Sequence, residues 1–463
     1  MRLLPGLLIF LVASFQLSAH PSSLSLLRVF DSSVSAKPIG FPEPVSSGIG
    51  IRSSLMYGYR DGEEKELVAD SVLGSVGFAA GSLAAEAWGR IDAVSFRWDY
   101  PETDVDAVSE LKAAGFRFSI ADLAGGGVWI ENGRPYGDAF LYLPITGNAG
   151  IGITGGLAPA FSGVASFDYP FQSIVFGADL LTGAISARME SPLWSSSLSL
   201  LSGTSIEREE AKEPVMFSDL PLVMAAASTV ALKIGGFGLN VSAMMASARI
   251  APLPAELVYA ECDDFEPLFY SVCLQLDLPF PITLNFNMSQ LTIPSGEGYF
   301  SGSDYLFLFG SILGEERLTW TRIQASRIGA AIRGTFDLAG MRMDLEAGYD
   351  AIRIDGNISI SRKETQWIST GPFFWQGRYV DSWPVLTGTA FAEVPDGAAH
   401  FGIGIESGIG RNQSFTFEAR QYIPVNIPRN GGSTSIPSIP SIPSGDNPAY
   451  GGLLIAFGWK WVP

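Results

Sequence analysis

The sequence predicts an all-β fold, a transmembrane antiparallel β-barrel of roughly 14–20 strands, with an even strand number expected. Three observations predict it. The chain begins with an export signal, its body is apolar and poor in charge without a helical span, and apolar and polar residues alternate along much of its length.

The first nineteen residues have the layout of a secretory signal peptide. Arg2 is their only charged residue, residues 3–13 form an apolar core, and Leu17-Ser18-Ala19 precede a cut expected before His20. A retained membrane anchor is the alternative, but the apolar stretch is shorter than the roughly 20 residues of a helical span. We therefore assign residues 1–19 to a cleaved signal peptide, 20–46 to a periplasmic extension or plug segment, and 47–463 to the barrel.

The composition favours a barrel over helical membrane spans. Charged residues make up 16% of the chain, against roughly 25% in soluble proteins, and the mean hydropathy is +0.24. The best candidate for a helical span, residues 220–232, is too short and ends at Lys233. Because only helices and closed barrels satisfy backbone polar groups in lipid, this chain is expected to form a barrel. The net charge of −18 argues against nucleic acid as a partner.

The clearest alternation lies at residues 341–350, where apolar and polar residues change at every position, as on the two faces of a strand. We assign the polar face to the lumen. The charged residues that alternate with Ile352 and Ile354 are assigned to the lumen as well. The predicted lumen-facing residues are Arg342, Asp344, Glu346, Arg353 and Asp355. They either line an open lumen or pair with one another in a plugged interior. Gly356-Asn357 is then expected to form a tight turn.

The last strand-like segment, Tyr450–Trp461, carries apolar residues on one face that become aromatic towards its end. These are Leu453, Ile455, Phe457, Trp459 and Trp461, which we expect to face lipid. The segment resembles the closing strand of bacterial outer-membrane β-barrels, in which alternating apolar residues end in an aromatic, although here Val462-Pro463 follow. The resemblance implies a bacterial outer-membrane location, outer-membrane lipid as surroundings, and contact with the barrel assembly machinery through this strand.

Connection lengths agree with that direction of the last strand. Barrels of this class have short periplasmic turns and longer external loops. The connection at 424–449 is long, repeats Ser-Ile-Pro and is expected to be an external loop, whereas the connection at Arg411-Asn412 is short and expected to be periplasmic. Residues 104–115 place Val105, Val108 and Leu111 at helical spacing, which predicts a short helix in a loop.

Two cysteines, Cys262 and Cys273, flank an acidic, proline-containing stretch. Their even number in an exported chain predicts a disulfide, and a pair of unbridged thiols is the alternative. His400 is the one histidine of the expected barrel and is interpreted as a strand-end residue, because no nucleophile or base is placed beside it by the sequence. We expect no enzyme activity, no cofactor and no metal site.

The function expected from this architecture is that of a pore or transporter for small solutes, with inward charges setting selectivity. A closed barrel that acts as a surface-binding or scaffold protein is one alternative. An exported soluble β-rich binding protein, with its apolar faces packed in a sandwich core, is the other.

Overall fold

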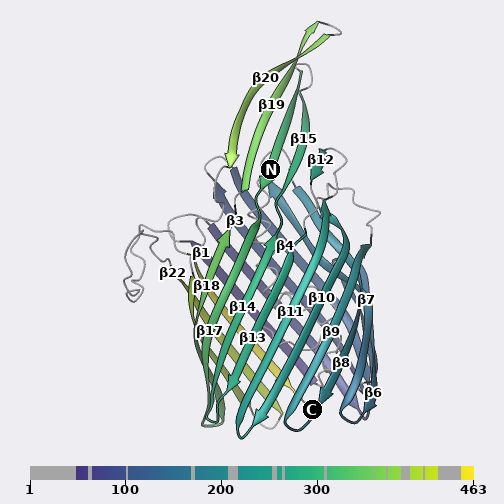
Figure 1. Ribbon diagram of the computed structural model, residues 1–463, viewed down its shortest axis with the longest axis vertical. Helices are drawn as coiled ribbons and strands as arrows, with labels where there is room; N and C mark the ends of the chain where they lie inside the picture. Colours follow the sequence, from purple (N-terminus) through teal and green to yellow (C-terminus); the bar gives the residue numbers. More distant parts are fainter. Residues whose placement is uncertain are drawn as a thin grey trace.

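The structure of this chain is a computed structural model. It describes residues 48–60, 65–100, 103–121, 123–167, 173–206, 217–252, 258–262, 266–306, 310–356, 358–371, 374–386, 397–409, 412–425 and 450–462. Within these ranges every regular element is a strand, and no helix long and apolar enough to cross a membrane is found there. The strands form two antiparallel sheets (Figure 1).

The larger sheet has 18 strands and closes on itself, because β1 pairs with β2 on one side and with β23 on the other. The all-β barrel and its even strand number are therefore confirmed. The barrel strands are β1 (Gly48–Arg60), β2 (Lys65–Ala80), β3 (Leu83–Tyr100), β4 (Thr103–Ile120), β5 (Ala124–Glu131), β6 (Arg134–Thr146), β7 (Ala149–Phe167), β8 (Ser173–Glu190), β9 (Trp194–Ile206), β10 (Phe217–Ile234), β11 (Phe237–Pro252), β13 (Leu268–Asp277), β14 (Ile282–Ile293), β17 (Ile323–Leu338), β18 (Met341–Asp355), β21 (Gly397–Ile409), β22 (Gln413–Val425) and β23 (Tyr450–Trp461).

The smaller sheet has five strands in the order β12-β15-β16-β19-β20 and lies beyond one end of the barrel (Figure 1). These strands are β12 (Val258–Cys262), β15 (Gly296–Leu306), β16 (Gly310–Trp320), β19 (Ile358–Gly371) and β20 (Phe374–Leu386). The tight turn expected at Gly356-Asn357 is wrong, because β18 pairs with β17 and β21 whereas β19 pairs with β16 and β20. The chain passes there from the barrel into the second sheet.

The opposite end of the barrel carries short connections, and we call it the short-turn end. Gly235-Gly236 and Ala339-Gly340 have positive φ at both positions, as a two-residue turn between twisted antiparallel strands requires. The connection around Asn412 lies at this end and is short, as predicted. Barrels of this class turn their short connections towards the periplasm.

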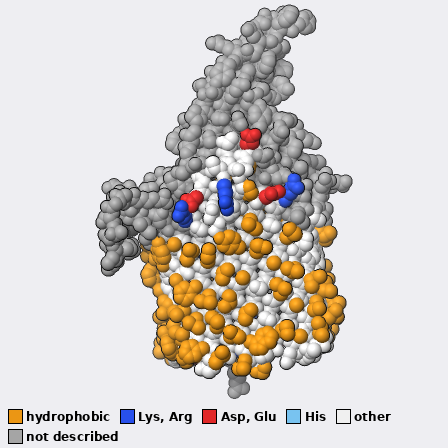
Figure 2. Space-filling view, viewed as in Figure 1, with side chains coloured by type: hydrophobic (Ala, Val, Ile, Leu, Met, Phe, Trp, Pro, Cys, Tyr) orange, Lys and Arg blue, Asp and Glu red, His pale blue; other side chains and the backbone are white. Residues whose placement is uncertain are grey.

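The outer face of the barrel forms an apolar belt. Figure 2 shows hydrophobic side chains over the lower part of the visible face of the barrel, with charged side chains in a row above them. Along β5, Val128 is 64% exposed and alternates with buried Trp129, and along β8, Ile185 is 58% exposed between buried Ala184 and Ser186. A soluble sandwich would bury such residues in a core, so the soluble alternative is wrong and the belt is the lipid-facing surface of a transmembrane barrel.

The helix expected at residues 104–115 is wrong, because these residues lie within β4. That strand pairs with β3 along its whole length, from Leu83↔Ile120 to Tyr100↔Thr103. Phe116 and Phe118, both exposed, mark where β4 crosses the belt. Beyond the belt the outer face meets water, so the strand no longer needs apolar alternation there.

Several sequence-based assignments lie outside the described residues. They are the signal peptide at 1–19, the extension or plug at 20–46, and residues 426–449 of the expected external loop. The loop begins later than expected, since Pro424 and Val425 belong to β22.

Candidate functional site

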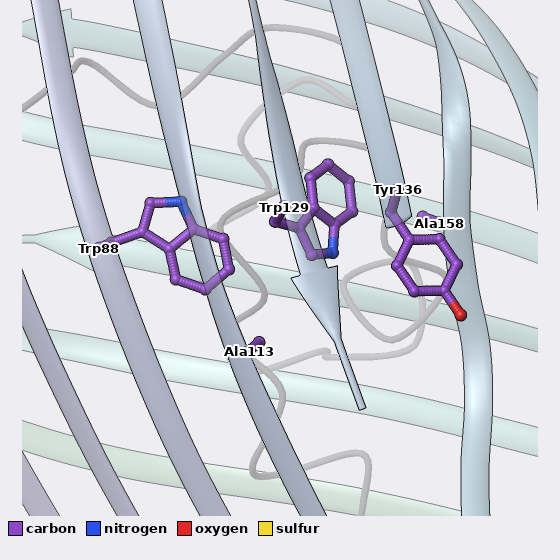
Figure 3. Packing of buried hydrophobic residues seen from close by; sticks show 5 residues of the cluster. All are labelled: Trp88, Ala113, Trp129, Tyr136 and Ala158. Atoms are coloured by element: carbon purple, nitrogen blue, oxygen red, sulfur yellow. The ribbon is translucent and has the colours of Figure 1, made fainter. Parts of the chain in front are cut away.

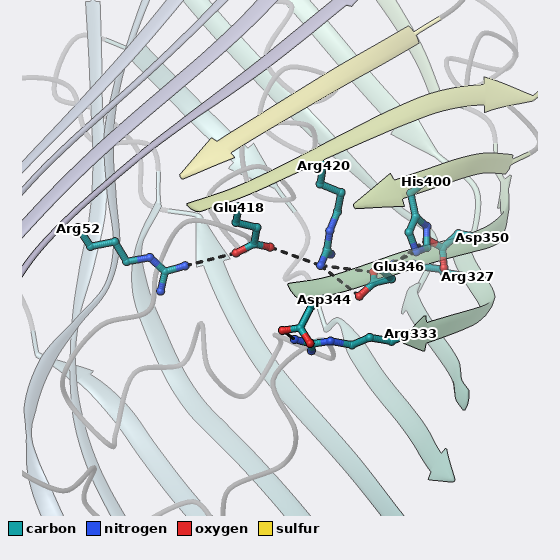
Figure 4. Close-up of polar contacts among 9 residues, drawn as sticks. All are labelled: Arg52, Arg327, Arg333, Asp344, Glu346, Asp350, His400, Glu418 and Arg420. Carbon is teal, nitrogen blue, oxygen red and sulfur yellow. Dashed lines mark hydrogen bonds and ion pairs between the residues drawn. The ribbon is translucent and has the colours of Figure 1, made fainter. Parts of the chain in front are cut away.

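A connected set of opposite charges crosses the inner wall of the barrel from β1 to β17 (Figure 4). Its members come from the face that alternates with the apolar belt. They are Arg52, Glu418, Arg420, Glu346, His400, Asp350 and Arg327, and beside them lies a separate cluster of Arg333, Asp344 and Arg342. We call these ten residues the charged ladder.

The ladder begins near the short-turn end with its weakest contact. The Arg52 Nη2 atom lies 3.9 Å from Glu418 Oε2. Arg420 then joins two carboxylates, with its Nη2 atom 3.5 Å from Glu418 Oε1 and 3.4 Å from Glu346 Oε1. Arg420 therefore joins a carboxylate of its own strand, β22, to one of β18.

The other end of the ladder is centred on His400. Its Nε2 atom lies 3.3 Å from Glu346 Oε1 and its Nδ1 atom 3.4 Å from Asp350 Oδ2. Arg327 Nη2 donates to the same Asp350 oxygen at 2.8 Å. The ring of His400 thus stands between two carboxylates.

Asp344 is the centre of the separate cluster. Its Oδ2 atom accepts a hydrogen bond from Arg333 Nη2 at 2.6 Å, and its Oδ1 atom accepts one from Thr335 Oγ1 at 2.6 Å. Arg342 Nε lies 3.9 Å from Oδ1. Asp344 of β18 is thereby fixed by two donors of β17, while Arg342 stays loosely held.

Small inward residues let the charges meet across intervening strands. The register places Gly402 of β21 between Glu346 of β18 and Arg420 of β22. Likewise, Gly458 of β23 lies between Arg52 of β1 and Thr416 of β22, next to Glu418. A long side chain at either glycine would stand between the groups that pair.

Two further glycines make room for the buried end. A Cβ at Gly348 would lie 2.5 Å from His400 Cε1 and Nε2, and one at Gly329 would collide with Asp350 Oδ1. Because buried charges need partners, this close packing holds His400 and Asp350 where both are paired.

Exposure increases along the ladder towards the short-turn end. The side chains of Asp350 and His400 are 5% and 8% exposed, whereas those of Arg342 and Arg52 are 54% and 66% exposed. Exposed pairs contribute only about 0–1 kcal/mol each, so the open end of the ladder can exchange its partners for a solute at little cost. The ladder holds five arginines against four carboxylates, besides His400, and is close to neutral.

The structure separates the predicted lumen-facing residues into two groups. Arg342, Asp344 and Glu346 lie in the charged ladder. Arg353 and Asp355 do not, because β18 keeps its alternation without a bulge and places them on the same face as Tyr349. They pair with each other on the outer face, 2.7 Å apart, and Arg353 is 74% exposed. The assignment of these two residues to the lumen is wrong, because the outer face turns polar above the belt.

Sequence reasoning missed most of the ladder. Glu418 and Arg420 alternate with Phe415, Phe417 and Ala419, which marked them as the polar face of a strand. The alternation does not say which strand lies beside β22, so the pairing of Arg420 with Glu346 had no signal in the sequence. His400, interpreted as a strand-end residue, is instead a paired member of the ladder.

The middle of the wall that faces the ladder is rich in hydroxyl groups. β8 lies nine strands from β22 in either direction around the 18-stranded barrel. The inward face of β8 and β9 carries hydroxyl groups along its middle, as in the Ser186 Oγ to Ser199 Oγ hydrogen bond of 2.8 Å, and an ion pair of Arg188 and Glu190 at the end of β8. Ser197 and Thr229 share a similar hydrogen bond of 2.6 Å.

A third part of the inner wall is packed with aromatic side chains (Figure 3). Trp88, Trp129 and Tyr136 are each at most 8% exposed, and the rings of Trp129 and Tyr136 stack with centroids 5.9 Å apart. Gly115 lies between the two tryptophans in the register, and a Cβ there would lie 2.5 Å from Trp129 Cβ. Because these rings are buried, we assign them to packing rather than to solute contact.

The expected lipid-facing residues of the closing strand lie on one face of β23. Phe457 is 49% exposed and its ring contacts Phe417 at 5.2 Å between centroids. Leu453, Ile455, Trp459 and Trp461 share its parity along the strand. In the register, Ile455 and Trp459 lie opposite Leu55 and Ile51 of β1, which are themselves exposed.

The structure records Cys273 as a free thiol rather than as half of the predicted bridge to Cys262. The registers give the reason. Cys273 pairs with Asn287 of β14 inside the barrel, whereas Cys262 pairs with Gly298 in the second sheet. Among the described residues, no group of three or more His, Cys, Asp or Glu is placed to hold a metal ion.

Comparison with known proteins gives matches at the level of solved structures. A scan of protein-family models and a search of curated proteins find no match to the sequence. Pseudomonas aeruginosa OccK11 (OpdR) matches with a TM-score of 0.40 and 9% identity over 91% of this chain and 99% of its own. Pseudomonas aeruginosa OprD gives 0.34 and 12% over 93% and 98%, and the ferric citrate transporter FecA gives 0.33 and 8% over 90% and 79%.

Proposed function

We propose that this protein is a bacterial outer-membrane pore that passes small solutes through its lumen, with the charged ladder setting selectivity. The observation that carries the proposal is the contrast between the two faces of one wall. The outer face is an apolar belt, while the inner face carries charges that increase in exposure towards the short-turn end. Charged side chains that line a lumen select the ions and solutes that pass it.

The proposal includes delivery to that membrane. A cleaved signal peptide at residues 1–19 would export the chain, and the barrel assembly machinery would engage β23. The aromatic residues at the end of β23, Trp459 and Trp461, support this role because aromatic girdles mark the membrane interface of such barrels.

The test uses the full chain in planar bilayers at low salt, where charges are least screened. The wild type should give stepwise conductance. Arg342→Ala removes an exposed lumen cation and should shift the permeability ratio towards cations. Arg353→Ala removes an arginine from the outer face and should leave that ratio unchanged. Absence of conductance, together with no solute entry in liposome swelling, would overturn the pore.

A closed barrel that binds a partner at the cell surface is the second candidate, and the five-stranded sheet favours it. That sheet continues the barrel strands beyond the belt and, in the described residues, ends in two edge strands, β12 and β20. Edge strands present unpaired backbone groups that an extended peptide can join. Deleting the residues of β19 and β20 should then abolish partner binding and leave permeability intact.

A further inference from the structure

A pocket of about 300 Å³ opens on the inner wall where the ladder reaches the short-turn end. It is built by β1, β2, β21, β22 and β23. Its lining includes the charged Arg52, Glu406 and Lys460, the hydroxyl-bearing Ser75, Ser414 and Thr416, and the glycines Gly48, Gly50 and Gly458, besides the apolar Ile49, Ile51, Leu73 and Trp459. A volume of this size suits a small solute of several non-hydrogen atoms.

The charges of this pocket are held apart by the fold. In the register, Glu406, Thr416, Gly458 and Arg52 form one row across four strands. With neighbouring strands about 4.8 Å apart, the backbones of Glu406 and Arg52 are separated by about 14 Å. Lys460 projects from the next row, beside Ser414. The pocket therefore has a cationic side at β1 and β23 and an anionic side at β21.

These groups are available to a ligand. Within the described part of the chain, neither Lys460 nor Glu406 forms an ion pair, and Arg52 makes only the 3.9 Å contact with Glu418. Arg52 is also the most exposed member of the ladder at 66%. A solute with one positive and one negative group can pair with both sides at once, whereas a simple ion would leave one side without a partner.

We propose that this pocket is a binding subsite for small zwitterions of the α-amino acid type. The carboxylate lies at Arg52 and Lys460, the ammonium at Glu406, and the side chain extends over the glycine floor. The hydroxyls of Ser75, Ser414 and Thr416 complete the hydrogen bonds of the two charged groups. The subsite deepens the proposed pore, because a solute held there lies in the permeation path.

The test is equilibrium binding by calorimetry on the full chain folded in detergent, which does not depend on conduction. The probes are norvaline, pentanoate and pentylamine, which share a carbon chain and differ in charge. Norvaline should bind at least tenfold more tightly than either other probe. Glu406→Gln and Lys460→Gln should each weaken norvaline at least tenfold. Lys233→Gln, a matched lysine at the end of β10 on a different part of the wall, should leave binding unchanged.

The possible outcomes separate the fate of the subsite from that of the pore. Equal binding of the three probes, or norvaline binding that survives both pocket variants, overturns the subsite. Conductance without norvaline binding overturns the subsite and leaves the pore standing. Norvaline binding that is lost in the pocket variants, in a protein without conductance, supports the subsite and overturns the pore. A gel-mobility shift on boiling, measured for every variant, shows that its barrel is folded.

Discussion

Arg420 on β22 reaches Glu346 on β18 across an intervening strand, with 3.4 Å between Nη2 and Oε1. Two strands that are not neighbours lie about 10 Å apart, so the pair depends on what the middle strand places between them. That residue is Gly402 of β21. This pair is therefore a property of three strands together, and its two charges meet across a position that carries no side chain.

The pairing of Arg420 with Glu346 is expected to depend on Gly402. A double-mutant cycle with Arg420→Gln and Glu346→Gln should give a coupling energy of about 1 kcal/mol in urea unfolding from lipid vesicles. In a Gly402→Leu background the coupling should fall to nearly zero, because the leucine side chain fills the space between the two groups.

Two controls isolate this effect. Gly402→Ala should keep the coupling, since a Cβ there would lie in ordinary contact, 3.5 Å from Arg420 Nε and 3.6 Å from Glu346 Cβ. Gly74→Leu adds the same side chain at a β2 position where nothing lies within 4 Å of a Cβ, and should also keep it. Coupling that persists in Gly402→Leu would show that the two charges interact through another route.

Gly348→Ala is expected to destabilise the barrel by about 1–3 kcal/mol, the usual cost of overpacking. The added Cβ would lie 2.5 Å from the ring of His400 and 2.8 Å from Ala330 O, so the ring must leave its place between Glu346 and Asp350. The urea midpoint of the variant measures the loss. Gly404→Ala is the matched control, because its Cβ would be 3.5 Å from Asp344 Cβ. Equal midpoints for the two variants would contradict the packing described for His400.

The outer face could be predicted from the sequence because lipid imposes one rule on every strand that crosses the belt: the side chains that point outward are apolar. Met341, Leu345 and Tyr349 of β18 and the aromatic residues of β23 follow that rule. The rule ends where lipid ends. The wrong face predicted for Arg353 and the wrong helix predicted within β4 both occur beyond that point. The assignment of Arg353 to the lumen follows its charge, although the alternation of β18 continues past the belt and places it on the outer face, and the predicted helix falls where β4 extends beyond the belt.

The inner face could be predicted only residue by residue. Alternation identified Asp344 and Glu346 as inward, but the partner of each depends on which strands become neighbours. β18 and β21 are adjacent in the barrel although β19 and β20 lie between them in the sequence. That excursion into a second sheet places His400 beside Gly348, and no local pattern encodes it.

Ile332→Arg is expected to cost about 2–4 kcal/mol, the penalty for an arginine on the lipid face near the middle of the bilayer. Ile332 lies midway along β17 on the face of Ile328 and Phe336, and all three are exposed. Gln324→Arg, on the same face of β17 but opposite Asp355 above the belt, should cost almost nothing. The comparison of urea midpoints in vesicles locates the upper border of the belt. A similar cost at both positions would place that border higher than Asp355.

The two cysteines are expected to remain thiols in the folded, oxidised protein. Their backbone partners, Asn287 and Gly298, are eleven positions apart (298 − 287) along β14 and β15, which extend at about 3.3 Å per residue. A disulfide needs Cα atoms within roughly 7 Å, so the folded barrel keeps Cys262 and Cys273 too far apart to join. Alkylation in denaturant without reductant, followed by intact mass measurement, should label both of the 2 cysteines of the chain. The control variant Cys273→Ser should take up one label. A wild-type protein that takes up no label would show that the two cysteines form a disulfide, and β13 would then have to shift relative to the second sheet.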